Sequence, residues 1–513
     1  MLLIPFFAGL SLMIYSWWLS YPLSITSASD VIFNHVNFLY WVSLPLLMCS
    51  MFLMAVTTKN SILKWLLAIG IVLTIYSIFY FYTNLPTADS EYFRGLSEYL
   101  ATTKNLDASQ SNHVYYQWPS FFILNYVGTL LSGVSLANFE FILFSLIGFL
   151  LTTSLYVYLH SRYKNGAFFA VVAFWVSIFY FIDYQAAPFS LAFAIFFIIL
   201  MLETRQKNVA ILVTQILLYI SLLITHAFVP LFFIIYLFIR SILDRRRLYG
   251  YAGTLLLFSV ITFITVQLTL ARVSLTQNIL YVFAESQTFS QIAQQTFVST
   301  IVPTDVLAQF FSRTITVVFI LTCVAGFIFL FIKKRLTFLD KAILITGATY
   351  SILGVVVNTL GYRAVPIALI PVSLGTAFIF ESKLRKYFIG IFMILLVLFV
   401  FIPIHQSFSS MVSYQTKTDY AAENFLINNY NWRASTRIVA GFRVATYIMP
   451  KLPNYELVDY DLSSINLDHI MVYTVELSQS FITQNTTLEN VIKDQSLNKV
   501  YDNGMASVEI RAH

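Results

Sequence analysis

The chain changes from apolar to acidic within the stretch "WLLAIGIVLTIYSIFYFYTNLPTADSEYFRGLSEYL" (65–100). Its first part, 65–83, carries no charged residue and is long enough to cross the ~30 Å hydrocarbon core of a bilayer as a helix. The part that follows places four charged side chains within ten positions: Asp89, Glu91, Arg94 and Glu98. The stretch therefore predicts a membrane helix that leads directly into an acidic segment.

The composition of the whole chain predicts a polytopic helical membrane protein. Hydrophobic residues make up 58% of the 513 residues and charged residues only 11%, whereas soluble domains carry about 25% charge. The first apolar segment lacks the basic start and cleavage site of a signal peptide, so we expect it to be a retained span. Thirteen spans are predicted, at about 3–25, 37–57, 65–83, 137–159, 167–182, 187–202, 208–224, 228–243, 250–271, 314–332, 338–360, 364–380 and 387–404.

Basic residues predict the orientation of these spans. One set of loops carries 17 Lys and Arg residues and the alternate set only five, namely Arg94, Lys104, Arg272, Arg313 and Arg363. Because Lys and Arg are enriched in cytoplasmic loops, the first set is expected in the cytoplasm. The long polar segments 84–136, 272–313 and 405–513 then lie on the outer face of the cell membrane.

Two domains are predicted, a transmembrane domain over 1–404 that includes the outer loop 84–136, and an extracytoplasmic α/β domain over 405–513. In the second domain, helical spacing marks 418–430, and "HIMVYTVEL" (469–477) reads as a strand. The segment "KVYDNGMASVEI" (499–510) has two β-rich runs around an Asn-Gly pair and predicts a hairpin. The predicted fold class is thus an all-α membrane protein with a small C-terminal α/β domain.

The run "WPSFFILNYVGTLLSG" (118–133) is apolar but short for a span, and a further span here would break the alternation of basic loops. It predicts a helix lying in the outer membrane interface. The aromatic residues Tyr115, Tyr116 and Trp118 at its start suit the depth of the lipid headgroups.

Two interpretations of the acidic segment remain open from spacing alone. In the first, 84–100 is an amphipathic helix whose acids are solvated and whose apolar face contacts lipid or protein, through Tyr92, Phe93, Leu96, Tyr99 and Leu100. In the second, Asp89 and Glu91 are functional carboxylates at the mouth of a span. An acid at a helix N-terminus is held ionised by the helix dipole, which suits a base or a metal ligand.

The second interpretation gains from a resemblance to the membrane glycosyltransferases of the C-type fold. Their first outer loop has an acidic motif, then a Tyr-containing amphipathic helix, then an aromatic–Pro segment that opens a short apolar helix. Here these parts read Asp89-Ser-Glu91-Tyr92, "GLSEYL" (95–100) and "VYYQWPSFFILNYVGTLLSG" (114–133). The chain resembles protein O-mannosyltransferases, the aminoarabinose transferases of lipid A and the catalytic subunit of oligosaccharyltransferase, most closely over 65–165. It departs from them in having more than one span before the acidic loop, where most members have one, and Trp118-Pro119 where many members have Pro-Pro.

Two further residues each have a structural and a functional interpretation. Arg363, in "GYRAVPIALIPVSLG" (361–375), is either an interfacial anchor or a clamp on phosphate, because a guanidinium pairs with phosphate oxygens as a fork. His226, in "LLITHAFVPLFF" (222–233), is either a satisfied structural residue or a hydrogen-bond partner of a donor phosphate. The C-type families often carry an Arg in a comparable late outer loop.

The resemblance implies an inverting transfer of a sugar from a polyprenyl-phosphate donor to an acceptor hydroxyl of a protein, lipid or glycan. Asp89 would act as the base, and Glu91 would orient the acceptor or join Asp89 in holding a divalent cation, Mg²⁺ or Mn²⁺. Arg363 would stabilise charge on the leaving phosphate. His226, Tyr115 and Tyr116 are the further candidates for substrate binding.

Two other classes of function are kept as alternatives. A transporter or flippase of lipid-linked substrates usually buries ionisable residues near the membrane midplane, but here the acids lie near span ends. A non-catalytic anchor or assembly protein would need only one span to present the C-terminal domain. The two cysteines, Cys49 and Cys323, fall in apolar runs and predict no disulfide or zinc site, and nothing supports nucleic-acid binding.

Overall fold

The computed structural model of the chain describes residues 2–23, 35–82, 88–106, 115–178, 186–205, 208–243, 251–270, 306–356, 361–404 and 425, and five strands between 437 and 511. A few helical residues within these ranges, Asp89, Glu91 and Arg363 among them, are described by their backbone alone.

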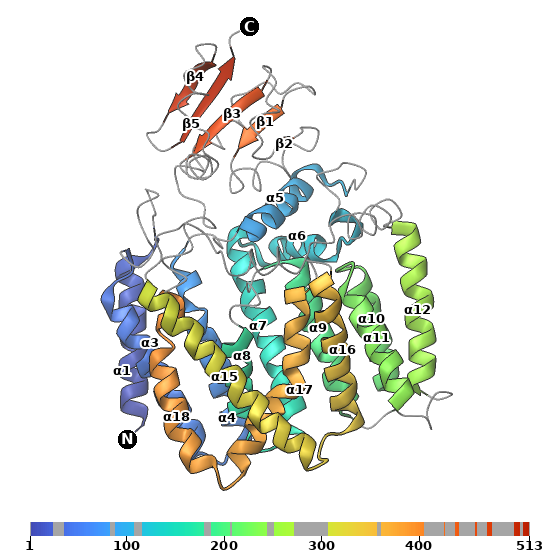
Figure 1. Cartoon of the computed structure of the whole chain (residues 1–513). Helices are drawn as coiled ribbons and strands as arrows, with labels where there is room; N and C mark the ends of the chain where they lie inside the picture. The colour runs from blue at the N-terminus through green and yellow to red at the C-terminus, as the bar shows by residue number, and fades with distance from the viewer. Residues whose placement is uncertain are drawn as a thin grey trace.

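The described part of the chain has a helix at each of the thirteen predicted span positions. These helices are α1 (Leu3–Ser20), α3 (Phe38–Thr57), α4 (Ser61–Ile75), α7 (Leu136–His160), α8 (Ala167–Ile178), α9 (Pro188–Glu203), α10 (Val209–Leu223), α11 (Val229–Leu243), α12 (Tyr251–Leu270), α15 (Val306–Ile332), α16 (Phe338–Val356), α17 (Gly361–Glu381) and α18 (Arg385–Leu398). Among the described residues, five apolar helical stretches are long enough to cross a membrane: Leu3–Ser20, Phe38–Thr57, Leu136–His160, Arg313–Ile332 and Arg385–Ile404. The apolar helical bundle shown in Figure 1 thus fits a membrane protein.

Polar residues directly before four of the helices explain where these helices begin. Asn37, Asn60, Ser135 and Asn208 each accept a hydrogen bond from a backbone N–H of the first turn that follows. Such caps satisfy N–H groups that have no partner inside the helix. These four helix starts can therefore be recognised in the sequence as polar residues between apolar runs.

The third span was predicted as one continuous helix over 65–83, and the structure differs from this prediction. The α-helix ends at Ile75, and the chain continues as a 3₁₀ helix, η1 (Ser77–Phe81). The hydroxyl of Ser77 donates to the carbonyl oxygen of Thr74 at 2.7 Å and lies 3.0 Å from the hydroxyl of Tyr40. These side-chain contacts compete with the regular helix ladder and explain the break at this point.

The turns rich in basic residues meet at one end of the bundle, called here the basic end. The Lys64 ammonium donates to the Asn165 side-chain oxygen at 3.2 Å, and the backbone N–H of Asn165 donates to Glu381 at 2.8 Å. Arg385 donates to the carbonyl oxygen of Val56 at 2.6 Å. These contacts join the α3–α4, α7–α8 and α17–α18 turns, and the opposite end of the bundle is called the α5 end.

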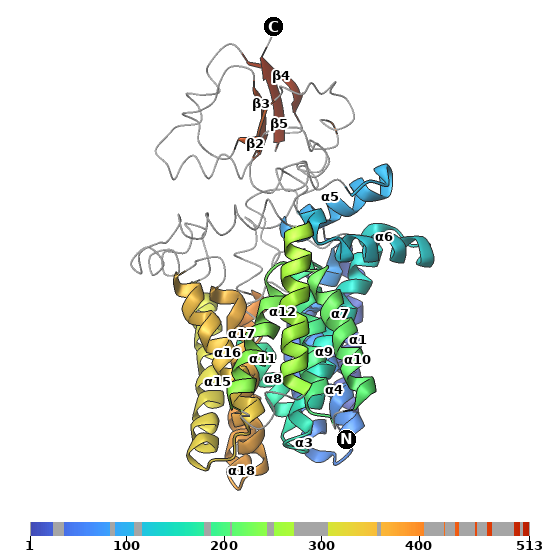
Figure 2. The same cartoon turned by 90° about the vertical axis from the view of Figure 1, so that its right-hand side faces the viewer.

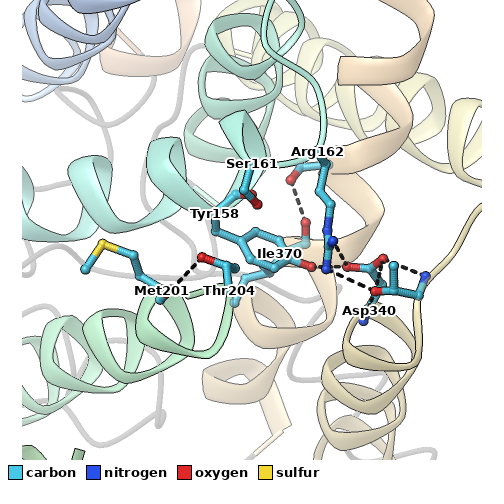
Figure 3. Close-up of polar contacts among 9 residues, drawn as sticks. Tyr158, Ser161, Arg162, Met201, Thr204, Asp340 and Ile370 are labelled. Atoms are coloured by element: carbon cyan, nitrogen blue, oxygen red, sulfur yellow. Dashed lines mark hydrogen bonds and ion pairs between the residues drawn. The ribbon is translucent and has the colours of Figure 1, made fainter. Parts of the chain in front are cut away.

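Asp340 holds a second group of contacts at the basic end, shown in Figure 3. Its carboxylate accepts hydrogen bonds from the Tyr158 hydroxyl at 2.5 Å and from the Thr337 hydroxyl at 2.7 Å. The guanidinium of Arg162 lies 3.8 Å away. Asp340 therefore both caps the start of α16 and fastens it to the end of α7.

A third polar group ties α9, α10 and α11 together near the same end. Glu203 and Arg240 form a buried ion pair. Gln215 donates to the Glu203 carboxylate at 2.6 Å, and the Tyr236 hydroxyl donates to it at 3.3 Å. A buried carboxylate is costly unless it is paired and hydrogen-bonded, and Glu203 is both.

Helix α17 packs closely against α8, α15 and α16. A Cβ placed on Gly375 would lie 2.2 Å from the carbonyl oxygen of Cys323, and one placed on Gly326 would lie 2.3 Å from the carbonyl oxygen of Gly375. Two glycines thus allow the backbones of α15 and α17 to touch, as is common between membrane helices. This packing fixes the position of α17, whose first turn carries Arg363.

The C-terminal segment contains a five-stranded sheet in the order β2-β1-β3-β5-β4. Its strands are β1 (Arg437–Ala440), β2 (Leu457–Val458), β3 (His469–Thr474), β4 (Leu497–Asp502) and β5 (Ala506–Arg511). The predicted strand in 469–477 is confirmed as β3, and the predicted hairpin is confirmed by the antiparallel pairing of β4 with β5. The predicted helix 418–430 lies outside the described residues except for Phe425.

Candidate functional site

Helix α5 (Ala88–Thr103) carries the acidic segment and packs on α6 (Ser120–Ser132) and α7. Figure 2 shows α5 and α6 together at one end of the bundle, with both helices running across the direction of the long helices. Asp89 and Glu91 fall in the first turn of α5. Their side chains lie outside the described part, so their catalytic roles stay predictions.

The apolar face of α5 is turned toward protein. Phe93, Leu96 and Leu100 are buried, whereas Tyr92 and Tyr99 are half-buried. The predicted amphipathic helix is therefore confirmed, and its apolar face contributes to the protein core. This packing holds the backbone of the first turn, and hence the acids on it, in a fixed place.

Glu98, expected to be solvated, is 36% exposed and also pairs with a cation of its own helix. The guanidinium of the buried Arg94 lies 3.5 Å from its carboxylate, at the i,i+4 spacing of one helix turn. Pairs at this spacing lie on one face of a helix and stabilise it. Glu98 thus neutralises a buried cation within α5, and of the described acids on this helix it is the one with a structural partner.

Tyr116 fastens the loop before α6 to the middle of α5. Its hydroxyl donates to the carbonyl oxygen of Leu96 at 2.6 Å, and its ring packs against Phe122 at 5.3 Å. Burial raises the pKa of the Tyr116 hydroxyl above its ordinary value, so the group remains a donor at neutral pH. The position of Tyr116 supports a role in holding α5, and substrate binding by this residue stays a prediction.

Tyr115 lies beside α5 in a different way. Its ring packs edge-on against Phe93 at 5.0 Å and against Tyr92 at 5.8 Å. The residue is half-buried. Tyr115 is therefore placed at the rim of α5, close to the turn that bears the acids.

Helix α6 joins α5 through a buried hydrogen bond. The Asn125 amide donates to the hydroxyl of Ser97 at 3.1 Å. The opposite face of α6 exposes apolar side chains, most strongly Leu130 at 63% and Leu131 at 83%. The predicted short apolar helix is present, and an exposed apolar face of this kind is suited to a membrane interface.

His226 lies in the turn between α10 and α11, next to the start of α6. The backbone N–H of Ser120 donates to the carbonyl oxygen of Ile224 at 3.0 Å. The ring of His226 is buried against Phe189, and its Nδ1 accepts a hydrogen bond from the backbone N–H of Phe228 at 3.1 Å. In the neutral ring the proton therefore sits on Nε2, which makes that nitrogen the donor.

Arg363 is the third residue of α17 and not part of a loop, since α17 begins at Gly361. The predicted boundary between the loop and the span was thus a few residues too late. α16 runs away from the basic end, and its neighbour α17 runs back toward it. Arg363, in the first turn of α17, therefore falls at the α5 end of the bundle. Its side chain lies outside the described part, and the phosphate contact stays a prediction.

Metal binding is also left as a prediction. No group of three or more His, Cys, Asp or Glu side chains gathers among the described residues. Asp89 and Glu91 are not among the side chains so tested. Two carboxylates on one helix turn are suitable ligands for Mg²⁺ or Mn²⁺, which bind oxygen.

Sequence reasoning missed several residues that the structure brings to this end of the bundle. The Arg94–Glu98 pair has the i,i+4 spacing that a charge-pattern search finds. The contact between Asn125 and Ser97, and the buried amide of Gln267 on α12, carry no spacing signal, because they depend on how separate helices pack.

No protein-family model matches the chain, and no curated protein matches it either. The functional argument therefore rests on the residues and on how the helices place them.

Proposed function

We propose that the protein is a membrane glycosyltransferase that moves a sugar from a polyprenyl-phosphate carrier to an acceptor hydroxyl. The observation that carries this proposal is the unbroken series of contacts from α5 to the His226 turn. Tyr116 joins its loop to α5, Asn125 joins α6 to α5, and Ser120 joins α6 to the α10–α11 turn. The acid-bearing helix, the aromatic–Pro segment and His226 thus share one end of the bundle, away from the basic end.

In this proposal all thirteen helices cross the membrane and the α5 end faces outward. The basic turns then lie in the cytoplasm, in accordance with the 17-to-5 distribution of Lys and Arg. The exposed apolar face of α6 lies in the outer interface, and residues 405–513 form an extracytoplasmic α/β domain. A lipid carrier in the bilayer would present its sugar directly beside α5.

The reaction needs one base and one group that stabilises the leaving phosphate. The acceptor oxygen attacks the anomeric carbon while the bond from that carbon to the phosphate oxygen breaks, so the configuration inverts. The acceptor proton passes to the Asp89 carboxylate. The electron pair of the broken bond stays on the phosphate, where Arg363 stabilises the growing charge. Glu91 orients the acceptor hydroxyl.

His226 and Tyr115 complete the site in this proposal. Because Nδ1 of His226 accepts a hydrogen bond from the N–H of Phe228, His226 donates from Nε2. The phosphate of the sugar carrier has only oxygens that accept hydrogen bonds. Tyr115 lends a partly exposed ring beside the acids, on which a sugar can stack. A divalent cation bound by Asp89 and Glu91 would supply further charge stabilisation, and no step above depends on it.

The structure gives less support to the alternative of a transporter. In the described long helices every Asp and Glu lies within two turns of a helix end, namely Glu140, Glu203, Asp340 and Glu381. Glu203 and Asp340 are engaged in the polar groups of the basic end. An ion path across the membrane would need ionisable groups in the middle of the helices. The alternative of a simple anchor leaves the packed α5–α6 arrangement without a purpose.

The proposal is tested by reconstituting the full chain in liposomes with a panel of polyprenyl-phosphate hexoses and a mixture of peptide, glycan and lipid acceptors. Release of polyprenyl phosphate that depends on an acceptor supports the transferase. Sugar-lipid movement between leaflets without bond cleavage would instead support the transporter. Neither activity in a folded, correctly inserted protein would support the anchor.

A further inference from the structure

The side chain of Gln267 on α12 is a buried amide without a partner. The residue is 1% exposed, and among the described residues neither its oxygen nor its nitrogen has a hydrogen-bond partner. Burial of an unmet polar group destabilises a fold, so such a group in a native protein calls for a physical reason. A ligand that occupies the site during function is one such reason.

The packing of α12 places this amide at the level of the His226 turn. α12 packs on α10 and α11, and the Tyr219 hydroxyl of α10 donates to the carbonyl oxygen of Ser259 on α12 at 3.0 Å. From that contact Gln267 lies eight residues farther toward the α5 end, or about 12 Å at the rise of an α-helix. α10 continues four residues beyond Tyr219, to Leu223, or about 6 Å on the same scale, and His226 follows in the turn.

A second buried polar group lies near the same turn. The indole N–H of Trp118 is buried and has no hydrogen-bond partner among the described residues. Trp118 is two residues from Ser120, whose N–H is bonded to the turn at Ile224. Unmet polar groups from α12 and from the segment before α6 therefore both lie at this end of the bundle.

Gln215 on α10 provides the contrast within the same group of helices. It is the same residue type and is fully buried, but its amide donates to Glu203 at 2.6 Å and lies 3.4 Å from the carbonyl oxygen of Ile199. At the basic end a buried amide is thus met by protein groups. At the α5 end, where the proposed substrate would lie, the amide of Gln267 has no hydrogen-bond partner among the described residues.

The chemistry of an amide limits what can complete it. Its nitrogen donates and its oxygen accepts, so its partner must offer both an acceptor and a donor. A phosphate diester offers acceptors only, whereas neighbouring sugar hydroxyls offer both. We infer that Gln267 binds hydroxyl groups of the transferred sugar and so contributes to the choice of sugar, an inference that rests on the proposed function.

The experiment compares Gln267→Met with Gln215→Met in the full chain in lipid nanodiscs. Methionine is close to glutamine in size but carries no amide. The unfolding temperature is measured without ligand, with polyprenyl phosphate, and with polyprenyl-phosphate glucose, mannose or galactose. Gln267→Leu is measured in parallel, as a second apolar replacement.

The inference predicts opposite effects in the two positions. Without ligand, Gln267→Met unfolds at a higher temperature than the parent, because an unmet polar group is removed, and Gln215→Met unfolds at a lower one. The affinity of Gln267→Met for the preferred sugar lipid falls about ten-fold, which corresponds to the loss of one or two neutral hydrogen bonds. Its affinity for polyprenyl phosphate does not change.

Each contrary outcome has a distinct meaning. If both Gln267 variants unfold at a lower temperature than the parent, the amide has a structural partner and the inference is wrong. If they are stabilised but bind the sugar lipid as the parent does, Gln267 lies outside the sugar site and the inference alone fails. If the parent shows no shift with any of the sugar lipids, the proposed function fails and the inference falls with it.

Discussion

The backbone N–H of Ser120 donates to the carbonyl oxygen of Ile224 at 3.0 Å, and this bond joins two segments more than a hundred positions apart. It fastens the start of α6 to the turn that carries His226. Since α6 is itself held to α5 by Asn125, the bond fixes the distance between the acid-bearing helix and that turn. The proposed site is therefore built from rigid packed elements, although two of its helices lie across the bundle.

Removal of the Tyr116 hydroxyl tests the hold of the loop on α5. Tyr116→Phe keeps the ring packing but loses the bond to the carbonyl oxygen of Leu96, and we expect a loss of about 0.5–1.5 kcal/mol in stability. Tyr126→Phe is the matched control, because Tyr126 on α6 contacts Lys104 through its ring. Thermal unfolding in nanodiscs measures both. Equal stability of the two variants would contradict the anchoring role of the Tyr116 hydroxyl.

Replacement of His226 by Asn distinguishes the roles of its two ring nitrogens. The Asn oxygen can accept from the N–H of Phe228 in place of Nδ1, but no donor remains where Nε2 lies. We expect nearly unchanged folding and a fall of roughly ten-fold in the use of a polyprenyl-phosphate sugar, the effect of about one hydrogen bond. Transfer rates of His226→Asn that match the parent would assign His226 a structural role alone.

Arg363→Ala tests the clamp on the leaving phosphate. If the guanidinium meets the phosphate in a dry site, transfer falls by about 10²–10³, and Arg363→Lys restores it only in part because the fork is lost. Arg313→Ala is the control, since Arg313 is a second cation near the same end of the bundle. Intact turnover of a normally inserted Arg363→Ala protein would leave this residue as an interfacial anchor.

The topology is tested by labelling single thiols from outside the cell. A cysteine at position 455 should react with a membrane-impermeant reagent, and one at position 246 should not, because the basic loops lie in the cytoplasm. Cys323 is buried and Cys49 is half-buried in a helix, so the unmodified chain gives the background. The reverse labelling pattern would contradict the orientation and, with it, the outward-facing site.

The sequence predicted the positions of the long helices because they coincide with apolar runs, and some of these runs begin directly after a capping residue such as Asn60 or Ser135. It also predicted the amphipathic nature of α5 and the pairing of β4 with β5. It did not predict the break at Tyr76, because Ser77 is drawn out of the helix ladder partly by Tyr40 on another helix. The burial of Gln267 was missed for the same reason, since it depends on how separate helices pack. Glu98 is partly exposed, as expected, and its pairing with Arg94 could have been found from the i,i+4 spacing.

The acidic turn of α5 is the centre of the account, and its test is a comparison of three single variants. Asp89→Asn keeps the size of the side chain but removes the base, while the start of a helix tolerates Asn well. Glu91→Gln tests the neighbouring carboxylate. Glu98→Gln is the control, because it removes a carboxylate that is paired with Arg94 and is expected to affect stability more than the chemical step.

The deciding measurement is the rate of sugar transfer from a polyprenyl-phosphate donor in liposomes that contain equal amounts of inserted parent or Asp89→Asn protein. The account predicts a fall of at least ~10²–10⁴ in this rate, the contribution typical of a general base, with thermal unfolding unchanged. A rate for Asp89→Asn equal to that of the parent would remove Asp89 from the mechanism. Full activity of all three variants would contradict the proposed enzyme and leave α5 as an amphipathic helix of the membrane surface.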